Sequence, residues 1–122
     1  MKPTLLGLRT TIYKVSDIAK AKQWYTKALQ IEPYFDQPYY VGFNVGGYEL
    51  GLQPENVPVG ENIAVFWGVE NIDQEYKNFL ECGATEVEKP MAVGEGIMVA
   101  TVKDPWGNLF GFIYNPNFKL NS

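Results

Sequence analysis

The chain contains two copies of one pattern, and this internal duplication restricts the folds open to it. Residues 9–18 (RTTIYKVSDI) and 63–72 (IAVFWGVENI) each read as a strand that leads into a polar residue suited to begin a helix. Near the end of each copy, residues 49–54 (ELGLQP) match residues 111–116 (GFIYNP), and both segments close on proline. We therefore expect two modules with the same order of elements.

The first copy predicts one strand, one helix and two further strands. The alternating character of residues 8–15 is typical of a strand. Ser16 or Asp17 can cap a helix that runs to about Leu29, because a side-chain oxygen at that position accepts an unpaired backbone N–H. After Pro33, residues 39–45 and 48–53 read as two strands joined at Gly46-Gly47.

The second copy predicts the same plan. Residues 62–69 read as a strand, and Asn71 is suited to cap a helix through Cys82. Short strands are expected over residues 85–88, 97–103 and 109–115. The segment Asp104-Pro-Trp-Gly-Asn108 reads as a turn, because proline presets φ and glycine supplies a positive φ.

Together these elements predict an α+β fold built from two βαβββ modules. A four-stranded sheet with one helix leaves one sheet face uncovered, so two modules can form an eight-stranded, incompletely closed concave barrel with the helices outside. We expect a single domain over residues 1–122, with one module at 7–54, the other at 62–116, and a linker near 55–61.

Composition narrows the range of partners. The chain has 122 residues, a net charge of −4 and one arginine, Arg9, so it lacks the basic surface that nucleic acid or an anionic membrane requires. No segment has the length of a membrane span, and a cytoplasmic protein is expected. The single cysteine, Cys82, allows no internal disulfide and is expected to be a buried or half-buried thiol.

Strand alternation separates a helix-facing side of each sheet from an open side. The helix-facing side is expected to be large and apolar, with Thr11, Tyr13, Val15, Tyr48, Leu50, Leu52, Val65, Trp67, Val69, Phe110, Phe112 and Tyr114. The opposite side is small or polar, with Thr10, Ile12, Glu49, Gly51, Gln53, Ala64, Phe66, Gly111, Ile113 and Asn115. Such a surface suits the floor of a ligand pocket, and a partly solvated sheet face without a ligand is the alternative.

Two motifs resemble one known family. Val15-Ser-Asp-Ile18, followed by Trp24-Tyr25 and Ala28-Leu29, is similar to the opening of vicinal oxygen chelate proteins, the glyoxalase, bleomycin-resistance and extradiol dioxygenase group. Asp104-Pro-Trp-Gly-Asn-Leu109 is similar to the turn before that family's last strand. The resemblance covers about residues 7–116, and it implies the two-module barrel and a homodimer.

The resemblance also implies where a metal would bind. Family members that use a metal take ligands from the first and last strands of each module, which here are Thr10, Glu49, Ala64 and Gly111. Only Glu49 is a credible ligand, and the chain has no histidine. Transition-metal sites draw on imidazole, thiolate and carboxylate, so we expect no metal and no cofactor.

The sequence therefore predicts a metal-free protein that binds a small molecule, with a cationic or aromatic compound as the expected ligand. One alternative is an enzyme, a lyase, isomerase or dioxygenase-like protein, in which Glu49 serves as metal ligand or general base. A second is a degenerate dimer with a structural or interaction role. The residues expected to bind the ligand are Thr10, Ile12, Tyr40, Glu49, Gln53, Phe66, Ile113 and Asn115.

Two further expectations concern a group of aromatic residues and one aspartate. An aromatic wall that stacks on such a ligand could be formed by Tyr39, Tyr40, Phe43, Phe66 and Trp106. Asp104 stands in a motif, but the turn itself explains it, because Asp accepts backbone N–H groups there.

Overall fold

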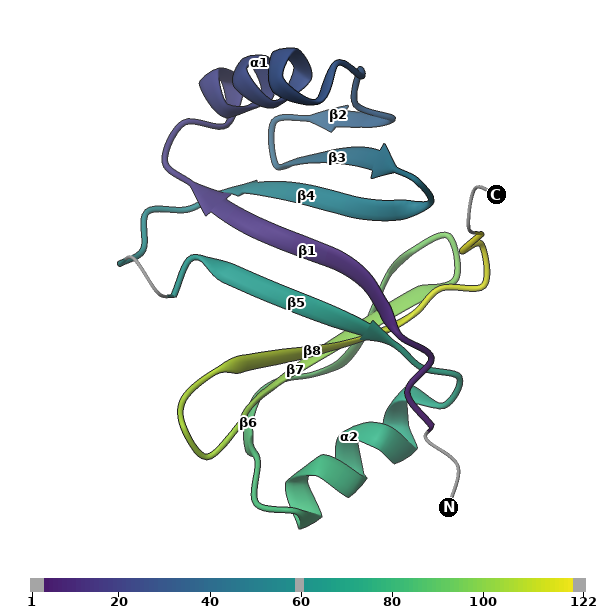
Figure 1. The fold of residues 1–122 in the computed structure, drawn as a ribbon. Coiled ribbons are helices and arrows are strands. Elements are labelled where there is room, and N and C mark those ends of the chain that lie inside the picture. The colour runs from purple at the N-terminus through teal and green to yellow at the C-terminus, as the bar shows by residue number, and fades with distance from the viewer. Residues whose placement is uncertain (1–3, 59–60, 120–122) are drawn as a thin grey trace. The chain divides into compact units, whose positions relative to one another are not determined.

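The computed structural model describes residues 4–58 and 61–119. These residues fall into two compact units (Figure 1). As far as the structure describes them, one unit holds Thr10–Ala64 with Lys119, and we call it the first module. The other holds Val65–Phe118 with the N-terminal residues up to Arg9, and we call it the second module.

The first module is a four-stranded sheet with one helix. Its strands lie in the order β2-β3-β4-β1, with β4 parallel to β1 and antiparallel to β3. The elements are β1 (Leu8–Val15, from Thr10 on in this module), α1 (Ile18–Leu29), β2 (Phe35–Gln37), β3 (Tyr40–Val45) and β4 (Tyr48–Pro54).

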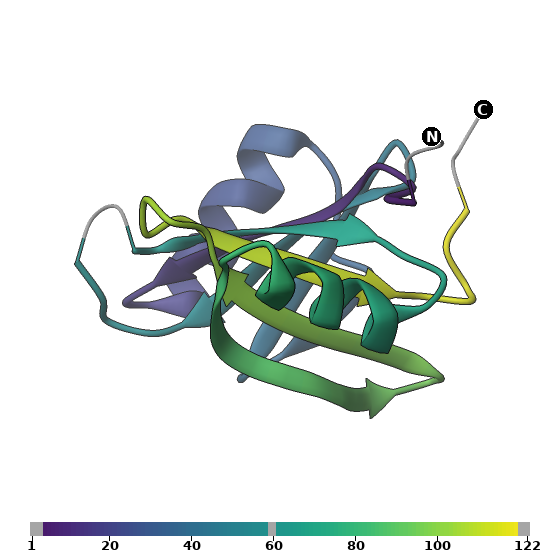
Figure 2. The ribbon, with the colours of Figure 1, turned by 90° about the horizontal axis from the view of Figure 1, so that it is seen from below.

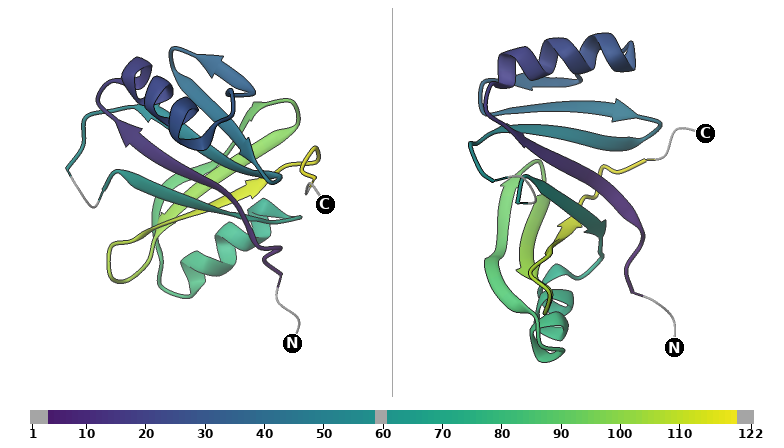
Figure 3. Two further views of the ribbon diagram at one scale, coloured as in Figure 1. Left: turned by 45° about the horizontal axis from the view of Figure 1, so that its top comes forward. Right: turned by 60° about the vertical axis from the view of Figure 1, so that its left-hand side comes forward.

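Helix α1 begins at a capped residue and packs on one face of this sheet (Figure 3). The Asp17 side chain accepts a hydrogen bond from the Lys20 N–H at 3.1 Å, which satisfies a donor that the helix itself leaves unpaired. The helix ends at Gln30, which adopts the left-handed conformation. Beneath it lie the buried side chains Val41, Phe43 and Leu52, against which Tyr13, Val15, Ile18, Ala21, Tyr25, Leu29 and Leu50 pack.

The second module repeats this plan. Its strands lie in the order β5-β8-β7-β6, and β5 runs parallel to β8 just as β1 runs parallel to β4. The elements are β5 (Ile63–Gly68, from Val65 on in this module), α2 (Ile72–Glu81), β6 (Thr85–Gly94), β7 (Ile97–Lys103) and β8 (Leu109–Tyr114).

Helix α2 lies across β7 and β8 (Figure 2). The Asn71 side chain caps it by accepting a hydrogen bond from the Gln74 N–H at 3.1 Å. The buried cluster under the helix contains Val69, Ile72, Tyr76, Ala100, Val102 and Phe112, and Phe110 and Tyr114 pack against it. Trp67 stacks on Phe110 with a ring-centroid distance of 5.6 Å, as expected for a helix-facing side chain.

The predicted α+β class and the two βαβββ modules are confirmed, as are both helix caps. The way in which the two sheets join stays a prediction. Two strands differ from the expectation. β6 extends to Gly94 rather than ending at residue 88, and its pairing with β7 contains bulges around a stretch with Pro90, where sequence favours a break. β2 was not predicted, because three exposed residues carry no periodicity.

Two other findings concern Cys82 and the lengths of the helices. Cys82 is exposed, so the expectation of a buried or half-buried thiol is wrong. It follows the last turn of α2, beyond the stretch of the helix that faces the core. Within residues 4–58 and 61–119, no helix has the length and apolar character needed to cross a bilayer.

Candidate functional site

Glu49 lies on the open face of the first module, in β4. Strand pairing places it opposite Thr10 of β1 and opposite Asn44 of β3. The neighbouring helix-facing residue, Leu50, packs against the core beneath α1, which fixes the opposite direction for Glu49. The alternation read from the sequence therefore assigned Glu49 to the correct face.

Three hydroxyl groups donate hydrogen bonds to the Glu49 carboxylate. Its Oε1 accepts from the Thr10 hydroxyl at 3.1 Å and from the Tyr40 hydroxyl at 2.9 Å. Its Oε2 accepts from the Tyr34 hydroxyl. We call these four residues the Glu49 cluster. All three donors are uncharged side chains, so both carboxylate oxygens are satisfied without a cationic side chain from residues 4–58 and 61–119.

Two glycines make room for the Glu49 cluster. A methyl group at Gly51 would lie 2.6 Å from Cζ of the Tyr40 ring. A methyl group at Gly42 would lie 2.8 Å from Oε2 of Glu49 and 3.0 Å from the Tyr34 ring. Neither glycine has a positive φ, so space rather than backbone conformation is the reason for glycine at these positions. The room that small residues leave in β3 and β4 is thus taken by tyrosine side chains.

Tyr40 and Tyr34 differ in how firmly they are held. Tyr40 is half-buried, and burial together with the adjacent Glu49 carboxylate raises the pKa of its phenol well above its ordinary value. Tyr34 is 62% exposed and precedes β2, where its backbone N–H bonds to the Gly42 carbonyl at 2.9 Å. The Tyr34 hydroxyl is therefore the donor that can leave Glu49 at the least cost in packing.

The structure brings some of the other predicted residues to the same face of the first module. Ile12 pairs with Gly51 and is 9% exposed, and Gln53 is half-buried opposite Lys14. Gln53 lies four residues from Glu49 in β4, and Ile12 lies two residues from Thr10 in β1, so both point to the same face as Glu49. Tyr40 and Thr10 contact Glu49 directly, whereas Gln53 makes no hydrogen bond to it within the described residues.

In the second module, the Phe66 ring fills the space beside Gly111, which has no side chain. Phe66 of β5 pairs with Gly111 of β8, and a methyl group at Gly111 would lie 2.5 Å from Cδ2 of Phe66. The ring thus covers the position where a side chain at residue 111 would stand. Ile113 is buried and Asn115 half-buried, and both line a separate pocket in this module.

The expected aromatic wall is wrong in part. Phe43 is fully buried beneath α1, because its register opposite Leu50 points it to the helix-facing side. Tyr39 and Trp106 are 65% and 84% exposed. Only Tyr40 of the tyrosines proposed for that wall reaches Glu49. Tyr34 also reaches Glu49, although no pattern in the sequence had pointed to it.

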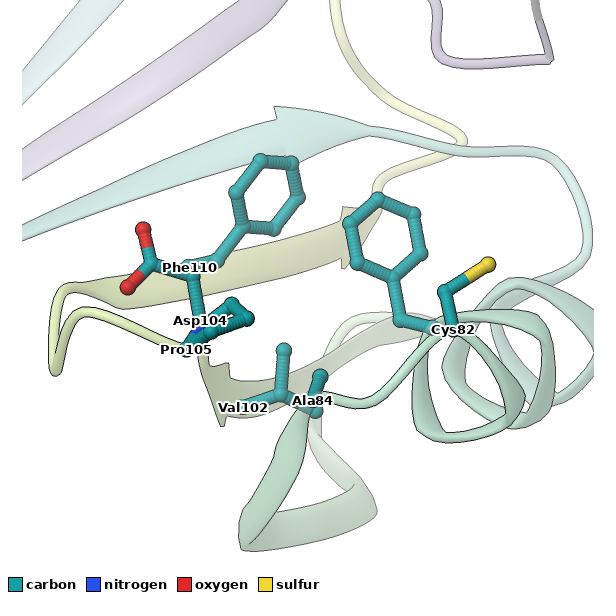
Figure 4. Close-up of a pocket in the computed structure, with 7 residues that line it drawn as sticks. Cys82, Ala84, Val102, Asp104, Pro105 and Phe110 are labelled. Atoms are coloured by element: carbon teal, nitrogen blue, oxygen red, sulfur yellow. The ribbon is translucent and has the colours of Figure 1, made fainter.

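The pocket in Figure 4 holds two residues that invite a chemical reading, Cys82 and Asp104. It has a volume of about 170 Å³ and an otherwise apolar lining of Phe79, Ala84, Val102, Pro105 and Phe110. The Cys82 sulfur and the Asp104 carboxylate point away from each other (Figure 4). Asp104 accepts hydrogen bonds from the Asn108 side chain and backbone and from the Trp106 N–H, each at 2.9 Å. The bonds from Asn108 come first in lowering the pKa of Asp104, and the predicted structural role in the turn accounts for this residue.

A known protein family matches most of the chain. Residues 7–112 match the Glyoxalase/Bleomycin resistance protein/Dioxygenase superfamily. The chain belongs to this superfamily. A comparison with proteins of curated function finds no match.

Solved structures of glyoxalase-superfamily proteins and others share the fold at low identity. A superfamily member from Vibrio splendidus 12B01 is 19% identical with a TM-score of 0.70, covering 88% of this chain and 99% of that one. A variant of the methylmalonyl-CoA epimerase of Streptomyces coelicolor, in complex with 2-nitronate-propionyl-CoA, is 12% identical with a TM-score of 0.76, covering 92% and 99%. A Mn(II)-bound glyoxalase from Novosphingobium aromaticivorans is 15% identical with a TM-score of 0.76, covering 98% of this chain and 42% of that one.

The side chains at the superfamily's metal positions do not fit a transition metal. Ala64 and Gly111 carry no donor atom, and the Phe66 ring covers Gly111. The hydroxyl of Thr10 is already a donor to Glu49, whose two oxygens accept three hydrogen bonds. Within the described part of the chain, no group of three or more Cys, Asp or Glu side chains could hold a metal ion. This donor set is too poor for the ligation that Mn²⁺, Fe²⁺ or Zn²⁺ requires.

Gly51→Ala tests the packing of the Glu49 cluster. The added methyl group forces the Tyr40 ring away from β4 and breaks its bond to Glu49, so we expect a loss of about 1–3 kcal/mol in unfolding free energy. Urea unfolding measures it. The same substitution in a Tyr40→Ala background should cost clearly less, because the ring is gone. An equal cost in both backgrounds would show that Tyr40 does not lie over Gly51.

The raised pKa of Tyr40 predicts a pH dependence of stability. Above about pH 10 the unfolded chain loses the phenol proton while the folded protein retains it, so this contribution is present below pH 10 and lost as pH rises. Above about pH 10, the unfolding free energy of Tyr40→Phe should fall less steeply than that of the wild type. The two slopes should differ by about 1.4 kcal/mol per pH unit. Tyr25 and Tyr76, whose pKa values burial also raises, act equally in both proteins. Urea unfolding between about pH 9 and pH 11 gives the two slopes, and identical slopes would contradict the assignment.

Proposed function

We propose that this chain is a small-molecule binding protein of the superfamily that anchors its ligand on Glu49 without a transition metal. The observation that carries the proposal is the pair of carboxylate oxygens held by Thr10, Tyr34 and Tyr40. A carboxylate arranged in this way offers a fixed negative anchor on the open face of the first module, where its three hydrogen-bond donors are neutral hydroxyls. The ligand that suits it is a cationic or hydrogen-bond-donating compound with an aromatic or apolar body.

The cluster suggests how a ligand would enter. Thr10 is 7% exposed and Tyr40 is half-buried, so their bonds hold Oε1 in place. Tyr34 is largely exposed, and its hydroxyl bonds to Oε2. A ligand ammonium or N–H group would take the place of the Tyr34 hydroxyl on Oε2, while the other two donors keep the carboxylate oriented. The Tyr34 ring, freed from Glu49, could then cover the ligand's face.

The proposal includes a homodimer and a cytoplasmic location. Support for an assembly comes from β6, the last strand of its sheet, where Val87, Met91 and Val93 are 42%, 47% and 54% exposed. Exposed apolar side chains on such a strand favour contact with another surface.

A thermal-shift screen with quaternary ammonium compounds, aromatic amines and neutral aromatic compounds tests the function. A compound that binds only the folded state raises the melting temperature. For a compound that does so, we expect Glu49→Gln to weaken binding by about 1.5–3 kcal/mol, which is the worth of a charge-assisted hydrogen bond. Tyr34→Phe should strengthen binding by about 0.5–1.5 kcal/mol, because Oε2 no longer has to be vacated.

Tyr39→Phe is the matched control for Tyr34→Phe. Tyr39 is an exposed tyrosine directly before β3, and it gives Glu49 no hydrogen bond. Unchanged affinity in Glu49→Gln would remove Glu49 from the site. Chemical conversion of a stabilising compound would favour the enzyme alternative. If no compound raises the melting temperature, a structural or interaction role gains the support instead.

A further inference from the structure

The second module contains a pocket that lies apart from the Glu49 cluster. It has a volume of about 250 Å³. Its surface is polar and apolar in nearly equal parts, and its two charged residues are of opposite sign. The residues that matter here are Leu6, Arg9, Glu70, Ile113, Tyr114 and Phe118. None of the four residues of the Glu49 cluster lines this pocket.

The single arginine of the chain is held in a defined position in this pocket. The guanidinium carbon of Arg9 lies 3.8 Å from the centre of the Phe118 ring. Its Nη1 donates to the carbonyls of Leu8 at 3.2 Å and Leu6 at 3.4 Å. The guanidinium also lies close over Gly68, where a methyl group would be 2.7 Å from Nε. Gly68 thus leaves the space that the side chain of Arg9 fills, and the guanidinium is oriented before any ligand arrives.

Part of the guanidinium is left for a ligand. Within the described residues, the N–H groups on Nε and Nη2 of Arg9 make no hydrogen bond. These two nitrogens form one edge of the planar fork, and such an edge binds a carboxylate through two parallel hydrogen bonds. We propose that this pocket binds a small organic carboxylate through Arg9, with the apolar body of the ligand against Leu6, Ile113 and Phe118.

The other charge in the pocket refines the ligand class. Glu70 lines the same pocket as Arg9, yet the two form no ion pair in the part of the chain that the structure describes. A ligand with a carboxylate at one side and an ammonium at the other would meet both charges. An amino acid with an apolar side chain has this arrangement, so it should bind more tightly than the same molecule without its amino group.

Three probes with the same aromatic body separate these contributions. Phenylalanine has both charges, 3-phenylpropanoate has only the carboxylate, and phenethylamine has only the ammonium. Isothermal titration calorimetry, with backbone amide shifts of Gly68 and Ile113 to locate the site, should rank phenylalanine first, 3-phenylpropanoate second and phenethylamine last. Glu70→Gln should remove the advantage of phenylalanine over 3-phenylpropanoate.

Variants at Arg9 test its role. Arg9→Gln should weaken the binding of 3-phenylpropanoate by about tenfold or more, which matches the loss of a charge-assisted contact. Arg9→Lys retains the charge without the planar fork, so its affinity should lie between those of the wild type and Arg9→Gln. The matched control is Lys22→Gln, which removes one positive charge from an exposed ion pair with Asp36 in the first module and should bind like the wild type. A thermal melt of each variant shows that it is folded.

Three results would overturn the proposal. These are equal affinity for the three probes, unchanged 3-phenylpropanoate binding in folded Arg9→Gln, or no saturation by either carboxylate up to about 10 mM. The last result would leave Arg9 with only the structural task of bonding the Leu6 and Leu8 carbonyls. The outcome does not depend on the function proposed for Glu49, because the Glu49 cluster contributes nothing to this pocket.

Discussion

A four-stranded sheet with a single helix has one face that the helix cannot cover, and the polar groups on that face need partners of another kind. The two modules meet this constraint differently. In the first, the Glu49 carboxylate accepts hydrogen bonds from three hydroxyls, and Gly42 and Gly51 provide the space for the tyrosine rings. In the second, the Phe66 ring lies over Gly111 and no polar group needs a partner at that position. Thr10, Glu49 and Gly111, which these arrangements involve, are three of the four positions expected to hold metal ligands from the family resemblance.

The difference between a hydroxyl-held and a metal-held carboxylate has chemical consequences. A metal ion would supply a Lewis acid or an activated water, whereas three neutral donors supply only a fixed orientation. Among the described residues, no cationic side chain pairs with Glu49, so its carboxylate can give its charge to a ligand instead. The Glu49 cluster thus suits recognition of a cation or donor group, and the exposed Tyr34 is the side chain whose displacement would accompany binding.

Much of the fold could be predicted because its signals are local. Asp17 and Asn71 cap their helices through bonds that reach three residues along the chain, and alternation placed Glu49 on the open face. Tyr34 could not be found in this way, because its contact with Glu49 depends on the pairing of β2 with β3. The sequence itself argues against Phe43 in the aromatic wall, since Tyr40 and Phe43 have opposite parity in one strand and cannot share a face.

Metal content tests the central claim most directly. The protein, purified without a histidine tag, would be incubated with Ni²⁺, Zn²⁺, Fe²⁺ or Mn²⁺, passed through a desalting column and measured by plasma mass spectrometry. If the three hydroxyls satisfy Glu49 and the other positions offer no ligand, each metal should remain at far below one ion per chain. Retention of one ion per chain, lost in Glu49→Gln, would contradict the account and direct attention to metal-dependent chemistry.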